Sequence, residues 1–184
     1  MELNMSDGTK TDQPIWFSMW FLTSIATFGA AFFPMFYRLI ENRNKHFRRE
    51  ADLERQIAAF LKAQGKEMPA PAEGFREMNA KAWAAAIILV VPVFAIAYLL
   101  SVDLLVHEKH QEMFLAAAFP KRMFMPQTIP IKKYVLITII TLGVGIVYWL
   151  YKIVNMYNAH YKAQWKIEKE IIRLMEEKTV DESL

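Results

Sequence analysis

The residues best suited to chemistry lie between residues 103 and 133. His107 and His110 are three residues apart, and four further potential ligands lie close to them in the sequence: Glu112, Met113, Met123 and Met125. Imidazole and thioether groups bind copper, and imidazole also binds zinc, so a metal site at this point is one hypothesis. The spacing differs from the His-Glu-x-x-His of zinc proteases, because only two residues separate the histidines. We expect these histidines to be interfacial polar residues of a surface helix, and we predict no metal and no cofactor.

Two further histidines, His46 and His160, occupy equivalent places in a repeated pattern described below. A histidine pair can respond to pH near neutrality, but hydrogen bonding to lipid head groups or to the partner repeat is the favoured interpretation. The chain has no cysteine, which excludes thiolate zinc sites and cysteine nucleophiles. It also lacks a glycine-rich phosphate loop and a Gly-x-Ser-x-Gly elbow. We therefore expect a protein that is not an enzyme.

The elements that carry these residues are three apolar blocks. Residues 15–37, 83–102 and 134–151 contain no charged side chain. About 20 mainly apolar residues are needed to cross a hydrocarbon core of roughly 30 Å. The third block is slightly short, but lysines at both of its ends can reach the interfaces. The sequence predicts an all-α integral membrane protein with three transmembrane helices.

The charges beside the first block predict its orientation. The N-terminal segment 1–14 is net acidic, whereas the segment that follows residue 37 is strongly basic. The positive-inside rule then places the N-terminus outside the plasma membrane, residues 41–82 inside, 103–133 outside and the C-terminus in the cytoplasm. Lysines and arginines between 121 and 133 favour the opposite orientation for the third span alone. The basic residues cluster beside apolar blocks, which indicates a lipid partner and no nucleic acid.

The chain also resembles itself at an offset of 114 residues. Residues 25–61 align with 139–175 without a gap and share eight identical pairs, among them Thr27/Thr141, Gly29/Gly143, Tyr37/Tyr151, Asn44/Asn158 and His46/His160. Charge, aromatic character and apolar phase are kept at many of the other pairs. We interpret this as an internal duplication.

Each copy predicts the same local arrangement. The Thr-x-Gly steps, Thr27 with Gly29 and Thr141 with Gly143, are expected to let helices pack closely in lipid. An aromatic residue and an Asn-x-His motif then mark the inner interface (Tyr37, Asn44, His46; Tyr151, Asn158, His160). No proline interrupts either copy beyond its aromatic residue, so each span is expected to continue into the cytoplasm as one helix.

The expected organisation has seven parts. They are a polar N-terminus (1–14), a first span with its helical extension (15–64), a linker rich in proline and glycine (65–82), a second span (83–102), an amphipathic outer loop (103–133), a third span with its extension (134–178) and a short tail (179–184).

The third span resembles a family of small prokaryotic membrane proteins known as domain of unknown function 4234. The resemblance lies in an Ile/Thr-rich entry with Gly143, followed by the Tyr-Trp-Leu-Tyr-Lys run at 148–152. The His107-Glu108 step with Gln111 looks like archaeal members. This resemblance implies architecture and no activity. The three-span topology also looks like that of archaeal Oxa1/YidC-type insertases.

The function expected from these features is structural. The features that the two copies share lie mainly on surfaces suited to helix packing. This favours a non-enzymatic scaffold or accessory subunit that binds itself or other membrane subunits through helix packing. The alternatives are an insertase-like or small channel protein, and a metal-binding accessory subunit that uses His107 and His110.

Overall fold

The structure is a computed structural model that describes residues 11–66, 70, 75–119 and 128–181, without the side chains of residue 174 and of 176–181. The regular elements of these residues are helices, which confirms the all-α class. They are α2 (Phe17–Ala26), α3 (Phe32–Ala63), α4 (Ala80–Ala86), the short 3-10 helix η1 (Ile87–Leu89), α5 (Val91–Ala118), α6 (Ile131–Ile140) and α7 (Gly145–Asp181).

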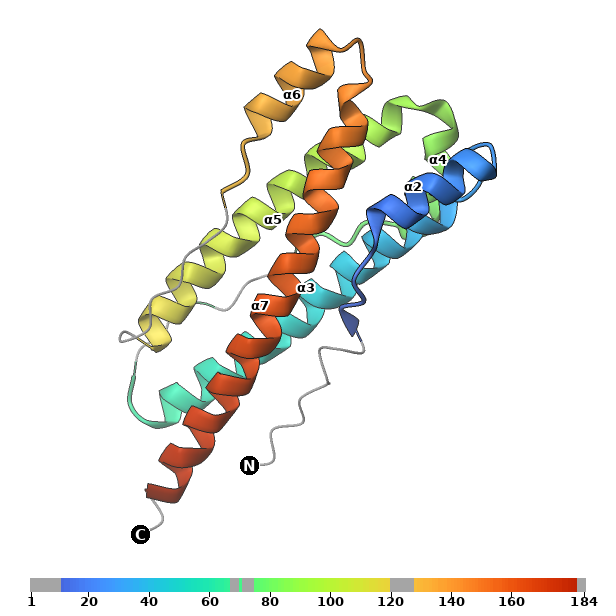
Figure 1. Cartoon of the computed structure of the whole chain (residues 1–184). Coiled ribbons are helices and arrows are strands. Elements are labelled where there is room, and N and C mark those ends of the chain that lie inside the picture. Colours follow the sequence, from blue (N-terminus) through green and yellow to red (C-terminus); the bar gives the residue numbers. More distant parts are fainter. Residues whose placement is uncertain (1–10, 67–69, 71–74, 120–127, 182–184) are drawn as a thin grey trace.

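The helices form three hairpins, each with a short first arm and a long second arm (Figure 1). The first hairpin is α2 and α3, the second is α4–η1 and α5, and the third is α6 and α7. The three turns lie at the same end of the molecule, and the long helices α3, α5 and α7 run from there in the same direction. We call the end that holds the turns the hairpin end and the opposite end, where the long helices terminate, the open end.

The first and third turns are built in the same way. Phe28 and Leu142 both have φ +49°, and the glycines that follow, Gly29 and Gly143, have φ +90° and +96°. Glycine adopts this left-handed region without the steric cost that other residues pay. A threonine hydroxyl completes each turn, because Thr27 Oγ1 accepts the amide hydrogen of Ala31 (3.1 Å) and Thr141 Oγ1 that of Gly145 (2.7 Å).

These turns correct the prediction of one continuous helix through each repeat. The helices predicted over 15–64 and 134–178 break at the Thr-x-Gly steps, since the chain reverses direction there without a proline. The steps form turns and not close helix contacts within the described chain: a Cβ atom added to Gly29 would meet nothing within 4 Å. The predicted second span breaks in the same manner at Val90, which has φ +61°.

By length and composition, α5 is the single helix among the described residues that could cross a membrane, which is weak evidence for a membrane location. The predicted placement of residues 41–82 and 103–133 on opposite sides of the membrane is wrong. Arg43 Nη2 lies 2.8 Å from Asp103 Oδ2, and Glu50 Oε2 lies 3.0 Å from His107 Nε2. The two segments meet because α5 runs parallel to α3 instead of returning through a bilayer.

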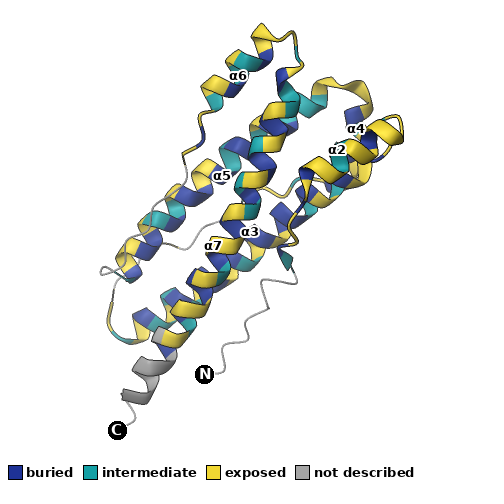
Figure 2. Cartoon of the chain, viewed as in Figure 1, coloured by how far each residue is buried: buried dark blue, intermediate teal, exposed yellow. Residues whose placement is uncertain are grey.

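Buried residues occur along both halves of the molecule (Figure 2). One core, which includes Met35, Leu39, Ile96, Leu100 and Ile153, fills the half toward the hairpin end. A second core joins the long helices toward the open end through Leu53, Ile57, Leu61, Phe114, Leu115, Ala118, Ile167, Ile171 and Met175. Between the two cores lies a layer of buried polar side chains, which holds the candidate site.

Candidate metal centre

Each long helix contributes one histidine to the polar layer. His46 comes from α3, His107 from α5 and His160 from α7, and the three side chains are at most 3% exposed. Their ring centroids are 4.9 to 5.5 Å apart. Each histidine follows the first residue with positive φ in its own hairpin by 17 or 18 positions. The three hairpins therefore bring equivalent side chains to a common centre.

A second polar set lies one helical turn further along. Glu50, Gln111 and Gln164 each follow their histidine by four residues, a spacing that puts both side chains on the same helix face. Gln164 Nε2 donates a hydrogen bond to Glu50 Oε1 (3.0 Å), and Gln111 Nε2 lies between Glu50 Oε1 and Gln164 Oε1 as a donor to both. These bonds hold the Glu50 carboxylate beneath the histidines.

Four ligand atoms converge at this centre. His46 Nε2 lies 2.9 Å from His160 Nε2 and 3.2 Å from Glu50 Oε2, and His107 Nε2 lies 3.0 Å from the same carboxylate oxygen. One ligand atom from each residue can be chosen so that all lie within 4.8 Å of one another. Ligands at the usual zinc distances of 2.0–2.1 Å stand about 3.4 Å apart in a tetrahedron. The shorter separations at this site are close to that value.

Carboxylates hold the opposite nitrogens of two rings. His46 Nδ1 lies 3.1 Å from Asp12 Oδ2, and His160 Nδ1 lies 2.8 Å from Glu108 Oε1. An Nδ1–H that donates to a carboxylate leaves the Nε2 lone pair directed at the centre, which is the usual outer arrangement around metal-bound histidines. Two of the three rings are thus oriented for ligation.

The pKa values of His46 and His160 reflect the same geometry. Burial alone would lower the pKa of His46, but its hydrogen bonds and charge interactions with Asp12 and Glu50 outweigh burial and raise the pKa to about 9. Burial lowers the pKa of His160 to about 4, despite its hydrogen bond to Glu108. The two shifts leave His46 as the donor and His160 as the acceptor in the contact between their Nε2 atoms.

Two atoms at the centre are poorly served by hydrogen bonds. Glu50 Oε2 and His107 Nε2 are buried 3.0 Å apart, and neither atom makes a well-aligned hydrogen bond with the described residues. Their charge environment is also unbalanced. Four buried carboxylates (Asp12, Glu50, Glu108 and Glu168) lie around the histidines. The Arg49 guanidinium bridges Asp12 (2.5 Å) and Glu168 (2.9 Å). Protonated His46 supplies a second positive charge, and burial raises the pKa of Glu168 to about 7, so the centre keeps only a small excess of negative charge. A divalent cation would bind both poorly served atoms and reduce the excess negative charge.

The structure separates the two histidines that the sequence grouped together. His107 belongs to the centre, whereas His110 lies outside it, a quarter exposed, with Nε2 3.1 Å from Glu54 Oε2. Met123 and Met125 lie outside the described residues.

The two asparagines of the repeat serve a different purpose from the one expected. Asn158 bonds both the N–H and the carbonyl of Ile15 (2.9 and 2.8 Å), and Asn44 bonds those of Met78 (3.2 and 2.7 Å). Each therefore fixes the backbone just before a short arm. Tyr37 is half-buried and Tyr151 is exposed.

Sequence reasoning missed the potential ligand Glu50 and the outer carboxylates Asp12 and Glu108. The signal that could have found Glu50 is the His-x-x-x-(Glu/Gln) pattern, which occurs once in each long helix. No family model matches the chain, and comparison with curated proteins and with solved structures gives no match either.

Proposed function

We propose that the protein is a non-enzymatic, membrane-associated helical scaffold whose three long helices are joined by one divalent transition-metal ion. His46, His107, His160 and Glu50 are the proposed ligands. The observation that carries this proposal is the convergence of four buried ligand atoms from three helices, with carboxylates on the far side of two rings. Among the functions expected from the sequence, it combines the scaffold with the metal-binding subunit, although with a different second histidine.

The closed surroundings favour a structural role for the metal. All four proposed ligands are buried, which leaves no open position of the kind that a catalytic zinc ion keeps for water or substrate. Three imidazoles and one carboxylate suit Zn²⁺ best among the common structural ions, with Co²⁺ as its spectroscopic substitute. Metal binding would then contribute directly to folding, because no preformed site exists in the unfolded chain.

Other features support a scaffold over an insertase. The groove between α2 and the third hairpin is lined mainly by apolar side chains, among them Phe17, Phe21, Ile137 and Val144, whereas an insertase needs a polar groove. The short arms α2 and α6 have equal lengths and begin 114 residues apart, which supports the proposed duplication. Association with itself or with another membrane subunit remains part of this proposal.

Metal analysis of the purified full-length protein tests the proposal. We expect about one equivalent of Zn²⁺ per chain after dialysis, in keeping with a single site of four ligands. Co²⁺ added to the metal-free protein should give the intense visible bands of tetrahedral coordination, and chelation should lower the unfolding temperature. A folded protein that takes up neither ion would overturn the proposal.

Two substitutions on the same helix supply a matched control. His107→Gln removes a proposed ligand and should abolish stoichiometric Zn²⁺ and the Co²⁺ bands. His110→Gln, one turn further along α5, changes a histidine that bonds Glu54 and should leave both unchanged. Circular dichroism of each variant checks that the helices are retained. Equal metal content in the two variants would exclude His107 as a ligand.

A further inference from the structure

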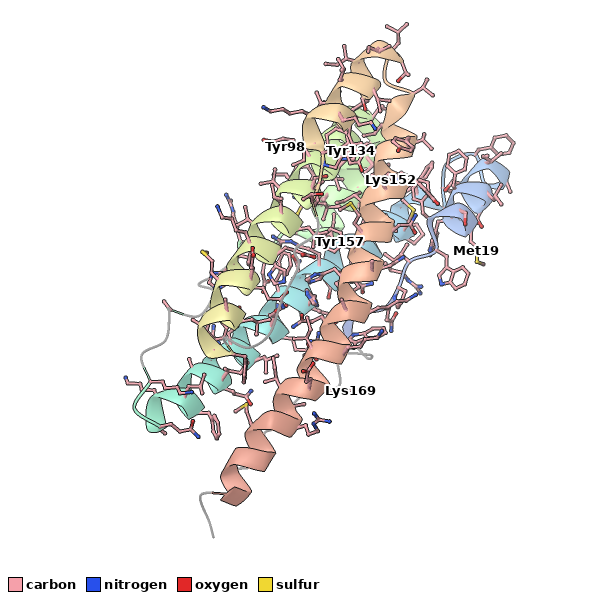
Figure 3. All side chains as sticks on the ribbon, turned by 60° about the vertical axis from the view of Figure 1, so that its left-hand side comes forward. Met19, Tyr98, Tyr134, Lys152, Tyr157 and Lys169 are labelled. Carbon is pink, nitrogen blue, oxygen red and sulfur yellow. The ribbon has the colours of Figure 1, made fainter. Side chains whose placement is uncertain are left out.

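The hairpin end exposes large apolar side chains on three separate turns. Phe28 and Leu142, at the tips of the first and third hairpins, are 101% and 95% exposed, and Val90 in the second is 63% exposed. The outer faces of the short arms continue this surface with Trp16, Met19, Leu22, Ile25, Ile88, Leu89, Leu136, Ile139 and Ile140. Figure 3 shows Met19 on the outer side of α2. An exposed apolar surface of this extent marks an interaction site.

The N–H groups of the first and third turns are bonded within the chain. In the first turn, the N–H groups of residues 27–30 bond to backbone carbonyls, and that of Ala31 bonds to the Thr27 hydroxyl. The third turn repeats this over residues 141–145. Val90 N–H bonds to the Ile87 carbonyl, and Pro92 has no N–H to satisfy. Backbone in hydrocarbon must satisfy its polar groups internally, and the bonded N–H groups of the first and third turns suit that environment.

The short arms have the length of one leaflet. The first arms of the hairpins, α2, α6 and the segment 80–89, each contain ten residues. At 1.5 Å per residue each is about 15 Å long, which is half of a hydrocarbon core of roughly 30 Å. The hairpins are therefore long enough to reach the bilayer midplane and too short to cross it.

The base of the hairpins is suited to lipid head groups. Lys132 and Lys133 are exposed at the start of α6, and Arg38 and Lys152 stack on Trp20 and Tyr148. Basic and aromatic side chains are favoured at the membrane interface, and the lysines and arginine favour anionic lipids. The groove between α2 and the third hairpin, about 530 Å³ in volume, provides apolar space for an acyl chain.

We propose that the three hairpins enter a single leaflet of an anionic bilayer from the same side, and that the open end stays in water on that side. The polar layer with the histidines then lies near the head groups, and the ends of α3, α5 and α7 share one compartment. This arrangement does not depend on the metal proposed above, because its evidence lies in the turns and short arms.

Single cysteines in the natural cysteine-free chain test this arrangement. Lys109 on α5 and Lys169 on α7 are both exposed, and Figure 3 places Lys169 near the open end. We expect Lys109→Cys and Lys169→Cys, in sealed vesicles containing phosphatidylglycerol, to react with an impermeant maleimide from the same side. Three membrane crossings would put these two positions on opposite sides, and that result would overturn the proposal.

A depth measurement tests the tips themselves. A fluorophore on Phe28→Cys or Leu142→Cys should be quenched by spin-labelled lipids and be several-fold less sensitive to iodide than the same fluorophore on Lys169→Cys. Quenching of the tips by iodide alone would show that they lie in water. Protection from both quenchers would indicate that a second copy or another protein covers the tips, and would also overturn the proposal. Zinc content in the same samples reports separately on the metal site.

Discussion

The two ends of the molecule have similar interiors and different exteriors. Inside, both are packed with apolar side chains that are almost completely buried, such as Ile153 toward the hairpin end and Ile57 toward the open end. Outside, the hairpin end exposes side chains such as Ile139 and Leu142, whereas the open end exposes lysines at positions 62, 109, 162, 166 and 169.

In the arrangement proposed above, the same long helices are matched to two solvents. A core buries apolar groups whatever surrounds it, so the interior alone carries no information about the environment. The exterior does, because a large exposed apolar surface is tolerated in lipid and unfavourable in water. The border between the two exteriors lies close to the polar layer, where the ion pair of Arg43 and Asp103 joins α3 to α5.

A large effect is expected at this border. The Arg43 side chain is 2% exposed and pairs with Asp103 at 2.8 Å. Asp103→Asn would leave a buried guanidinium with neutral acceptors only, and we expect a loss of about 3 kcal/mol in the free energy of unfolding. Thermal unfolding in detergent micelles, followed by circular dichroism, measures the change.

An exposed pair on the same helix gives the control. Glu41 and Lys45 lie 3.4 Å apart on the surface of α3, and Glu41→Gln should cost less than about 0.5 kcal/mol. If Asp103→Asn and Glu41→Gln lower the free energy of unfolding by the same amount, then water solvates the Arg43 guanidinium at this border.

The two cores should respond differently to the same deletion. Ile57→Ala should destabilise by about 2–5 kcal/mol, because it removes apolar contacts and leaves a cavity. Ile153→Ala should cost roughly half as much in lipid bicelles, since a chain that unfolds within lipid loses packing but does not expose the apolar group to water. Unfolding of both variants in the same bicelles measures the difference. Equal losses would mean that both cores meet water on unfolding, which would contradict the assignment of the hairpin end to lipid.

The all-α class could be predicted from the sequence, whereas the positions at which the chain reverses direction could not. Apolar blocks of 18 or more residues fit a spanning helix by length, but Phe28, Val90 and Leu142 adopt positive φ and reverse the direction within each block. Hydropathy reports the solvent around a segment and not its direction, so a re-entrant hairpin and a span look alike.

Part of the candidate site could also be predicted from the sequence. The offset of 114 residues matches His46 with His160, and these two residues are in contact in the structure. The third member, His107, was grouped with His110 because the two are neighbours in sequence. Asp12 could not have been found, since its approach to His46 depends on how the chain before α2 is held by Asn158. Contacts between distant segments follow from the chain reversals that hydropathy does not reveal.

The smallest effect is expected from substituting the equivalent glycines in the turns of the first and third hairpins. Gly29 and Gly143 adopt left-handed conformations, and a Cβ atom at either would have space, with Phe94 Cζ 3.6 Å from the one at Gly143. Gly29→Ala and Gly143→Ala should therefore each cost about 1–2 kcal/mol from backbone strain alone, as measured by thermal unfolding in micelles.

Gly145 provides the contrasting position. A Cβ atom there would lie 2.8 Å from the Thr138 Cα atom, so Gly145→Ala must displace backbone and should cost more than Gly143→Ala. The equivalent position in the first hairpin is already Ala31, which shows that the first turn accepts a methyl group where the third does not. Unequal costs for Gly29→Ala and Gly143→Ala would show that the two turns differ beyond this one position, and would weaken the case that both are adapted to the same depth in lipid.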